Sequence, residues 1–159
     1  MHLAPLDDCA DELDGALFGT LIHQVLQGFG RSDCRTSTRV AEIRDFLQSS
    51  LDQCARQQFG NHPLPPIPVQ LIQLKARLDR FAKIQSAWTA DGWRIEHTEV
   101  SGQGELMVDG QSFEISGRID RIDVNERTGQ RAVLDYKSSD TAVVPDKVHR
   151  KGEVWINLQ

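Results

Sequence analysis

The hydrophobic period of this sequence changes once, at Asp91-Gly92, and this change constrains the fold more than any other feature. Before it, apolar residues recur every three or four positions, as on the buried face of an α-helix. After it come short strand-like runs separated by glycine-containing turns. The sequence therefore predicts an α+β (mixed α/β) fold, in which N-terminal helices precede an antiparallel-containing β-sheet with flanking helices.

Three helices are expected before this change, at about residues 11–27, 37–58 and 69–90. Residues 28–33 are expected to form a loop, and four prolines between residues 60 and 68 predict a stiff connector. In the first helix, His23 falls outside the apolar arc formed by Leu17, Leu21 and Val25.

Strands are expected at residues 93–100, 105–108, 111–124 and 131–137. Turn signals at residues 102–104 and at Asp109-Gly110 flank the second of them. A polar turn joins the last two strands into a hairpin, which carries Asp120, Asp135 and Lys137.

This hairpin is the part of the sequence most suited to chemistry. Side chains alternate along a strand, so Asp135 and Lys137 project on one side. A turn near Thr128-Gly129 brings Asp120 within reach of Asp135 on the neighbouring strand. Two carboxylates so close repel each other unless a cation lies between them, and oxygen ligands suit Mg²⁺ or Mn²⁺. A lysine beside such a site can hold a water molecule or offset charge on a phosphate.

Simple surface ion pairs are the alternative explanation for the same hairpin. Asp120 and Asp135 could pair across it with Arg118, Arg121 or Arg131. Short motifs are often misleading when they stand alone.

The segments Gly117-Arg-Ile-Asp120 and Leu134-Asp-Tyr-Lys-Ser138 resemble the PD-(D/E)XK nuclease superfamily, most closely the nuclease domains of RecB- and AddB-type helicase-nucleases. The resemblance implies a restriction-endonuclease-like core and a metal-dependent DNA nuclease, expected to be an exonuclease in DNA repair or recombination. It implies DNA as substrate and a helicase domain or subunit as partner. It assigns metal binding to Asp120 and Asp135, catalysis to Lys137, and a further metal ligand to the backbone carbonyl of Tyr136.

Three more motifs of the family have counterparts in this chain. Gly19-Thr-Leu-Ile-His23 is similar to the family's G-T-L-x-H helix, whose histidine can join the metal site. Glu99 matches a glutamate on the strand before the hairpin, with Glu96 the weaker choice. Gln159 matches a catalytic-site glutamine that opens the last core helix, so the single domain over residues 1–159 is expected to be C-terminally incomplete.

The resemblance implies Mg²⁺ or Mn²⁺ as the cofactor. Some AddB-like relatives hold an iron–sulfur cluster with one upstream and three downstream cysteines. Cys9 could be the first of these ligands, but the downstream ones are not in this sequence, so no cluster is expected here.

The net charge of −5 is unusual for a DNA-binding protein, because phosphate contacts need basic groups. Metal-binding carboxylates count as negative until the ion binds, which weakens this objection. Lys147, Arg150 and Lys151 form a basic cluster that could contact phosphate. Two alternatives remain open: a domain that binds DNA or a partner protein without cutting, and a phosphodiesterase for RNA or small molecules on the same fold.

Composition predicts a cytoplasmic protein without a membrane segment. No apolar run approaches the length that spans a bilayer, and the N-terminus is acidic rather than basic and apolar. Three widely spaced cysteines without a C-x-x-C pair are typical of a reducing compartment.

Overall fold

The computed structural model describes residues 15–61, 63, 65–108, 111–137, 150–151 and 154–155. Helices come first and strands follow, as predicted: α1 Gly15–Arg31, η1 (a 3₁₀ turn) Asp33–Thr36, α2 Val40–Phe59, α3 Pro66–Ala90, β1 Trp93–Val108, β2 Gln111–Asn125, β3 Arg131–Leu134, β4 Arg150–Lys151 and β5 Val154–Trp155. The α+β fold class is therefore confirmed, and the arrangement is consistent with the expected restriction-endonuclease-like core.

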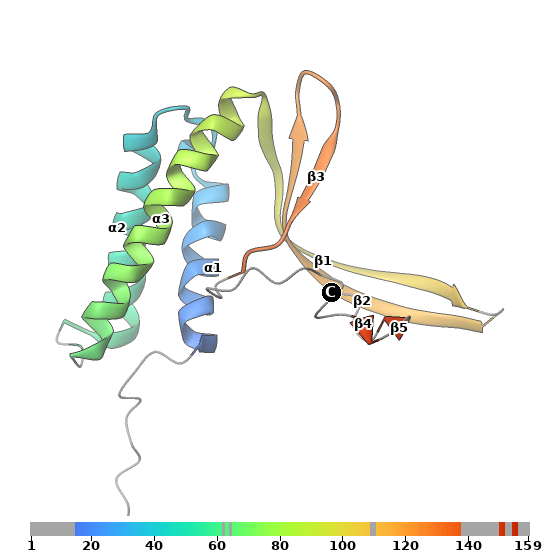
Figure 1. The fold of residues 1–159 in the computed structure, drawn as a ribbon, viewed down its shortest axis with the longest axis horizontal. Coiled ribbons are helices and arrows are strands. Elements are labelled where there is room, and N and C mark those ends of the chain that lie inside the picture. Colours follow the sequence, from blue (N-terminus) through green and yellow to red (C-terminus); the bar gives the residue numbers. More distant parts are fainter. Residues whose placement is uncertain are drawn as a thin grey trace, which may run out of the picture.

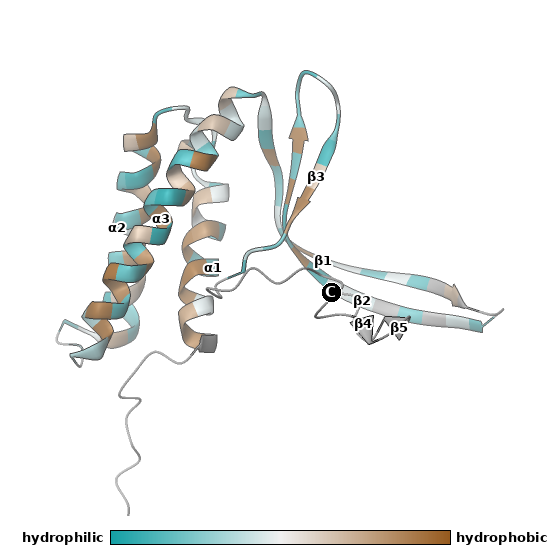
Figure 2. Ribbon diagram, in the orientation of Figure 1, coloured by the Kyte–Doolittle hydropathy of each residue, from teal (hydrophilic) through white to brown (hydrophobic). Residues whose placement is uncertain are grey.

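The three long helices lie side by side and enclose one apolar core (Figure 1). Fully buried side chains come from all three, including Leu21 of α1, Leu47 of α2 and Leu74 of α3. Each such side chain contributes about 1.5–3 kcal/mol through burial. Figure 2 shows apolar colour along most of α1, which packs against both α2 and β1.

The sheet has the order β1-β2-β3 and is antiparallel throughout. β1 and β2 pair along their whole length, from Trp93 with Asn125 to Val108 with Gln111. β3 pairs only with residues 121–124, near the C-terminal end of β2. Figure 1 shows the far part of the β1–β2 ribbon running away from the helices, while the near part lies beside them. The near part is therefore where the two layers meet.

Two predictions about helix and strand ends are wrong. The expected loop at residues 28–33 is helical as far as Arg31, because Phe29 is fully buried against Phe46 and Phe81. The expected turn at residues 102–104 does not form, because Gly102 and Gly104 pair in register with β2 and β1 continues to Val108. Non-local contacts outweigh local propensity in both places.

Helix α3 begins at Pro66, so the last three residues of the expected proline-rich connector are helical; proline is well tolerated in the first turn of a helix. The last strand is shorter than predicted. β3 ends at Leu134, so Asp135, Tyr136 and Lys137 follow the strand instead of lying in it. The turn before β3 matches the expected polar hairpin: Gly129 has φ 71°, a left-handed conformation that favours glycine, and its N–H donates to the Asn125 carbonyl at 2.8 Å.

Gly30 and Gly28 give a matched test of how closely α1 approaches β1. A Cβ on Gly30 would stand 2.4 Å from the Thr98 Cγ2 methyl, whereas one on Gly28 would meet nothing within 4 Å. We expect Gly30→Ala to destabilise the fold by about 1–3 kcal/mol through overpacking. Gly28→Ala should stabilise it by about 0.5–1 kcal/mol, because alanine is the better helix former. Urea unfolding of both variants checks this, and equal shifts would contradict the close approach.

Candidate metal centre

Three potential metal ligands converge where α1 meets β1 and β2. His23 comes from α1, Glu99 from β1 and Asp120 from β2, and one ligand atom from each lies within 4.8 Å of the others. His23 Nδ1 is 3.7 Å from Glu99 Oε1 and 3.5 Å from Asp120 Oδ1. A nitrogen and two carboxylate oxygens at this spacing fit a divalent cation.

The register of the sheet brings the two carboxylates together. A β-bulge at Glu96 shifts the pairing between Ile95 and His97 by one residue. Beyond the bulge, Thr98 pairs with Arg121 and Val100 with Ile119, which sets Glu99 opposite Asp120. Without the shift Glu99 would stand opposite Ile119, because a one-residue slip exchanges the faces of a strand.

Glu99 has an unusual backbone conformation. Its φ of 55° is left-handed, which is uncommon for a residue other than glycine and costs on the order of 1–3 kcal/mol. Its side chain is only 6% exposed, and that of Asp120 only 11%. Two acidic groups are thus held beside each other and largely out of water.

The main chain of Tyr136 joins two of the ligands. Its N–H donates to Asp120 Oδ2 at 2.6 Å, and its carbonyl oxygen lies 3.2 Å from His23 Nε2. When Nε2 carries the ring proton and donates a hydrogen bond to this carbonyl, Nδ1 has a free lone pair that faces the carboxylates. That is the tautomer a metal-binding histidine needs.

Asp135 and Lys137 lie outside the group of three ligands. Both side chains are exposed, and Lys137 Nζ pairs with Asp135 Oδ2 at 2.7 Å. Continued past Leu134, the β2–β3 ladder would bring Asp135 opposite Asp120, but Leu134 is the last paired residue. Their assignment as metal ligand and catalytic lysine, and that of the Tyr136 carbonyl as a ligand, stay predictions.

The remaining predicted residues fall in or beside undescribed parts of the chain. Cys9, Lys147 and Gln159 lie outside the described residues, and β4 places only the backbone of Arg150 and Lys151.

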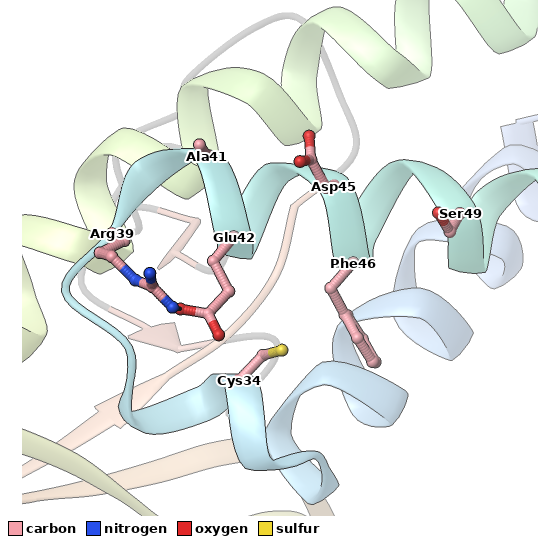
Figure 3. Close-up of a pocket in the computed structure, with 7 residues that line it drawn as sticks. All are labelled: Cys34, Arg39, Ala41, Glu42, Asp45, Phe46 and Ser49. Carbon is pink, nitrogen blue, oxygen red and sulfur yellow. Dashed lines mark hydrogen bonds and ion pairs between the residues drawn. The ribbon is translucent and has the colours of Figure 1, made fainter.

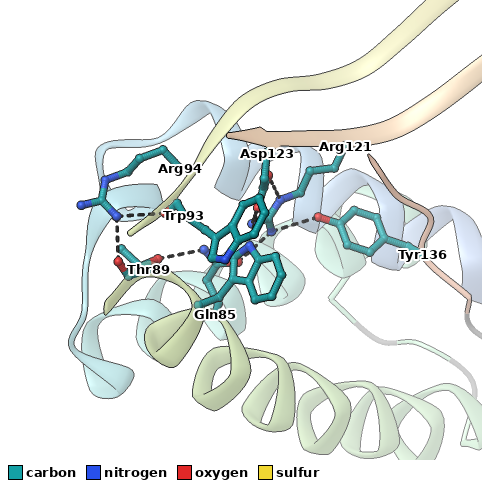
Figure 4. A network of polar contacts seen from close by, with 8 residues as sticks. Gln85, Thr89, Trp93, Arg94, Arg121, Asp123 and Tyr136 are labelled. Atoms are coloured by element: carbon teal, nitrogen blue, oxygen red, sulfur yellow. Dashed lines mark hydrogen bonds and ion pairs between the residues drawn. The ribbon is translucent and has the colours of Figure 1, made fainter. Parts of the chain in front are cut away.

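A buried polar network, which sequence reasoning missed, supports the site from the other face of β2 (Figure 4). Arg121 and Asp123 are both fully buried and form a two-point ion pair, at 2.6 and 2.5 Å. Arg121 also donates to Gln85 Oε1 at 2.7 Å and to the Tyr136 hydroxyl at 3.4 Å, and Trp88 Nε1 donates to Asp123 at 2.7 Å. Arg121 is therefore not a surface partner of Asp120 or Asp135, as the ion-pair alternative allowed.

This network changes the pKa values of two of its members. Burial is the largest single effect and would lower the pKa of the Arg121 guanidinium. The hydrogen-bond and charge interactions with Asp123 and Tyr136 together outweigh it and hold that pKa above its usual value. Burial raises the pKa of the Tyr136 hydroxyl, although the nearby Arg121 opposes this. Both groups therefore keep their protons across the physiological range.

A hollow of about 640 Å³ lies on a different surface, at η1 and the start of α2 (Figure 3). Two of its charged lining residues pair with each other, Arg39 with Glu42 at 2.8 Å. The hollow is lined by Cys34, Arg39, Ala41, Glu42, Asp45, Phe46 and Ser49. None of these residues belongs to the candidate metal centre, so the hollow is no part of that site.

With one histidine and two shielded carboxylates in one group, this α+β domain has the ligand set of a protein that could hold a divalent cation. The chain also matches the family model of the PD-(D/E)XK nuclease superfamily over residues 2–155. It therefore belongs to that superfamily, whose members are typically metal-dependent nucleases. No curated protein matches the sequence. None of the described helices is long and apolar enough to cross a membrane.

The buried and the exposed arginine pairs should differ sharply in their effect on stability. Arg121→Ala leaves Asp123 charged and unpaired inside the protein, which should lower the free energy of unfolding by about 3–5 kcal/mol. Arg131 pairs with Glu96 on the surface, so Arg131→Ala should change it far less. Denaturant unfolding measures both, and a double variant, Arg121→Met with Asp123→Leu, should recover most of the loss. Similar effects of the two single variants would contradict the buried network.

Tyr136 is the only tyrosine of the chain, so its ionisation can be observed directly. Its pKa is raised above the ordinary value of 10.0 in the folded protein. Above about pH 10 the unfolded chain loses this proton more readily, so stability should fall as pH rises through and beyond that value. Phenolate absorbance should appear at higher pH in the folded protein than in urea, and Tyr136→Phe should lessen the alkaline loss of stability. Titration at the same pH in both states would contradict the burial of this hydroxyl.

Proposed function

We propose that this domain is a metal-dependent DNA nuclease that hydrolyses phosphodiester bonds, with Mg²⁺ or Mn²⁺ held by His23, Glu99 and Asp120. The observation that carries the proposal is the convergence of these three side chains from separate elements. Membership of the PD-(D/E)XK superfamily supports it. We further propose exonuclease action and a role beside a helicase domain or subunit of RecB or AddB type, on the motif resemblance alone.

The chain's own residues have distinct roles in this proposal. Glu99 and Asp120 supply negative charge in a place that water barely reaches, where electrostatic attraction to a cation is strong. The Tyr136 N–H holds the Asp120 carboxylate, and the Tyr136 carbonyl orients the His23 ring. A bound divalent cation acts as a Lewis acid and lowers the pKa of water.

Asp135 and Lys137 complete the proposed machinery. They stand one residue on either side of Tyr136, whose main chain already contacts Asp120 and His23. The Asp135 side chain is exposed and follows directly after the last paired residue of β3, Leu134. In the proposal Asp135 becomes a further ligand, and Lys137, released from Asp135, offsets charge at the phosphate.

Glu99 and Glu96 provide a matched pair for testing activity. Both are glutamates of β1, but Glu96 pairs with Arg131 at 2.9 Å and is no member of the ligand group. With single- or double-stranded DNA and Mn²⁺, Glu99→Gln and Asp120→Asn should each lower the cleavage rate at least about 100-fold, because ligands are more sensitive than the groups around them. Glu96→Gln should cleave as the unaltered protein does. Cleavage unaffected by Asp120→Asn would refute the assignment, and the same assay on RNA tests the substrate class.

A second candidate is a domain on the same fold that binds DNA or a protein without cutting. The specific observation in its favour is that Asp135, 59% exposed, pairs with Lys137 rather than joining the other ligands. This candidate predicts DNA binding that does not depend on a divalent cation, and no turnover. A calorimetric signal for Mn²⁺ that Asp120→Asn removes would count against it.

A further inference from the structure

Arg118 is a charged residue at the centre that neither the fold nor the proposed chemistry explains. Its guanidinium Nε forms an ion pair with Glu99 Oε2, while Glu99 Oε1 faces His23. The two partners differ in environment: the Arg118 side chain is 63% exposed, whereas that of Glu99 is shielded. An exposed guanidinium group thus forms an ion pair with one of the candidate metal ligands.

The sheet register accounts for this contact. Arg118 pairs with Ser101 on β1, two residues beyond Glu99, and lies two residues before Asp120 on β2. Positions two apart on a strand share a face, so the three charged residues occupy neighbouring positions on one side of the ribbon.

Glu99 needs a positive partner whichever group supplies it. Its carboxylate is shielded from water beside that of Asp120, and leaving such a charge uncompensated is costly. Arg118 and a divalent cation can each provide that compensation. They cannot both do so without bringing two positive charges together on one carboxylate.

We propose that the Arg118 guanidinium and the divalent cation are alternative partners of Glu99, so that cation binding releases Arg118 to bind a phosphate group of the nucleic-acid backbone. The inference rests on the proposed function. A planar guanidinium binds phosphate oxygens at two points, and phosphate would replace the charge that Arg118 loses in Glu99. The release is inexpensive, because an exposed arginine gains little from a single ion pair. Cation and substrate binding are thereby coupled through one side chain.

Arg131 is the matched control. It makes the same kind of pair on the same sheet, with Glu96 at 2.9 Å, and it is also exposed. Glu96 does not belong to the ligand group, so Arg131 competes with no cation.

The first measurement is calorimetric titration of the full chain with Mn²⁺. Arg118→Ala should bind the cation about two- to five-fold more tightly than the unaltered protein, the factor by which an exposed pair competes. Arg118→Lys should stay close to the unaltered protein, and Arg131→Ala should not differ from it. Cation affinity that is unchanged or weaker in Arg118→Ala overturns the inference.

The second measurement is fluorescence anisotropy with a short single-stranded oligonucleotide, with Ca²⁺ or with chelator. With Ca²⁺, a hard cation that takes oxygen ligands, Arg118→Ala should lower DNA affinity about three- to ten-fold. The dependence on salt should also weaken by about 0.7 in the logarithmic slope, as for one lost phosphate contact on a single strand. With chelator the variant and the unaltered protein should bind alike. Electrophoresis confirms that the oligonucleotide stays intact.

An equal loss of DNA affinity with Ca²⁺ and with chelator overturns the coupling, as does no loss under either condition. The inference and the proposed function can fail separately. If the unaltered protein binds Mn²⁺ and Asp120→Asn does not, but Arg118→Ala binds it no more tightly, only the role of Arg118 is refuted. If the unaltered protein binds no divalent cation, both are refuted.

Discussion

The register between β1 and β2 is the constraint on which the candidate site depends. A single extra residue at Glu96 moves every later residue of β1 by one position against β2. Glu99 therefore lies opposite Asp120 rather than Ile119, and both carboxylates meet His23 of α1. The left-handed backbone at Glu99 lies just beyond this bulge. Bulges and strained residues commonly direct side chains at functional sites. Here, regular pairing without the bulge would leave Glu99 opposite Ile119, away from Asp120.

β2 carries charged residues on both of its faces, and the two sets have different environments. Asp120 and Arg118 belong to the side where the ligands converge, while Arg121 and Asp123 lie buried against α3. Tyr136 connects the two sides. Its hydroxyl contacts Arg121 (Figure 4), and its main chain contacts Asp120 and His23. The buried ion pair thus helps to hold the sheet on the helices, and its contact with Tyr136 also positions the segment that carries Asp135 and Lys137.

Charge compensation is local throughout this region. Glu99 pairs with Arg118, Glu96 with Arg131 and Asp135 with Lys137. The net charge of −5 is therefore a poor guide to the surface around the candidate site, where arginine and lysine accompany the acids. Arginine and lysine side chains that already lie beside carboxylates are therefore available at this surface for contacts with phosphate groups.

The local sequence pattern by itself determined the order of helices and strands and the position of the hairpin turn. Motif resemblance added the candidate site residues. The local pattern placed His23 outside the apolar arc of α1, and the structure brings that histidine to Glu99 and Asp120. Only the tertiary structure decided where α1 and β1 end, that Arg121 is buried, that Arg118 pairs with Glu99, and that Asp135 lies outside the ligand group. The physical reason is that periodicity reports which face of an element is apolar, not what packs on it. A bulge, the end of a strand ladder and the partner of a charge all depend on residues far away in the sequence.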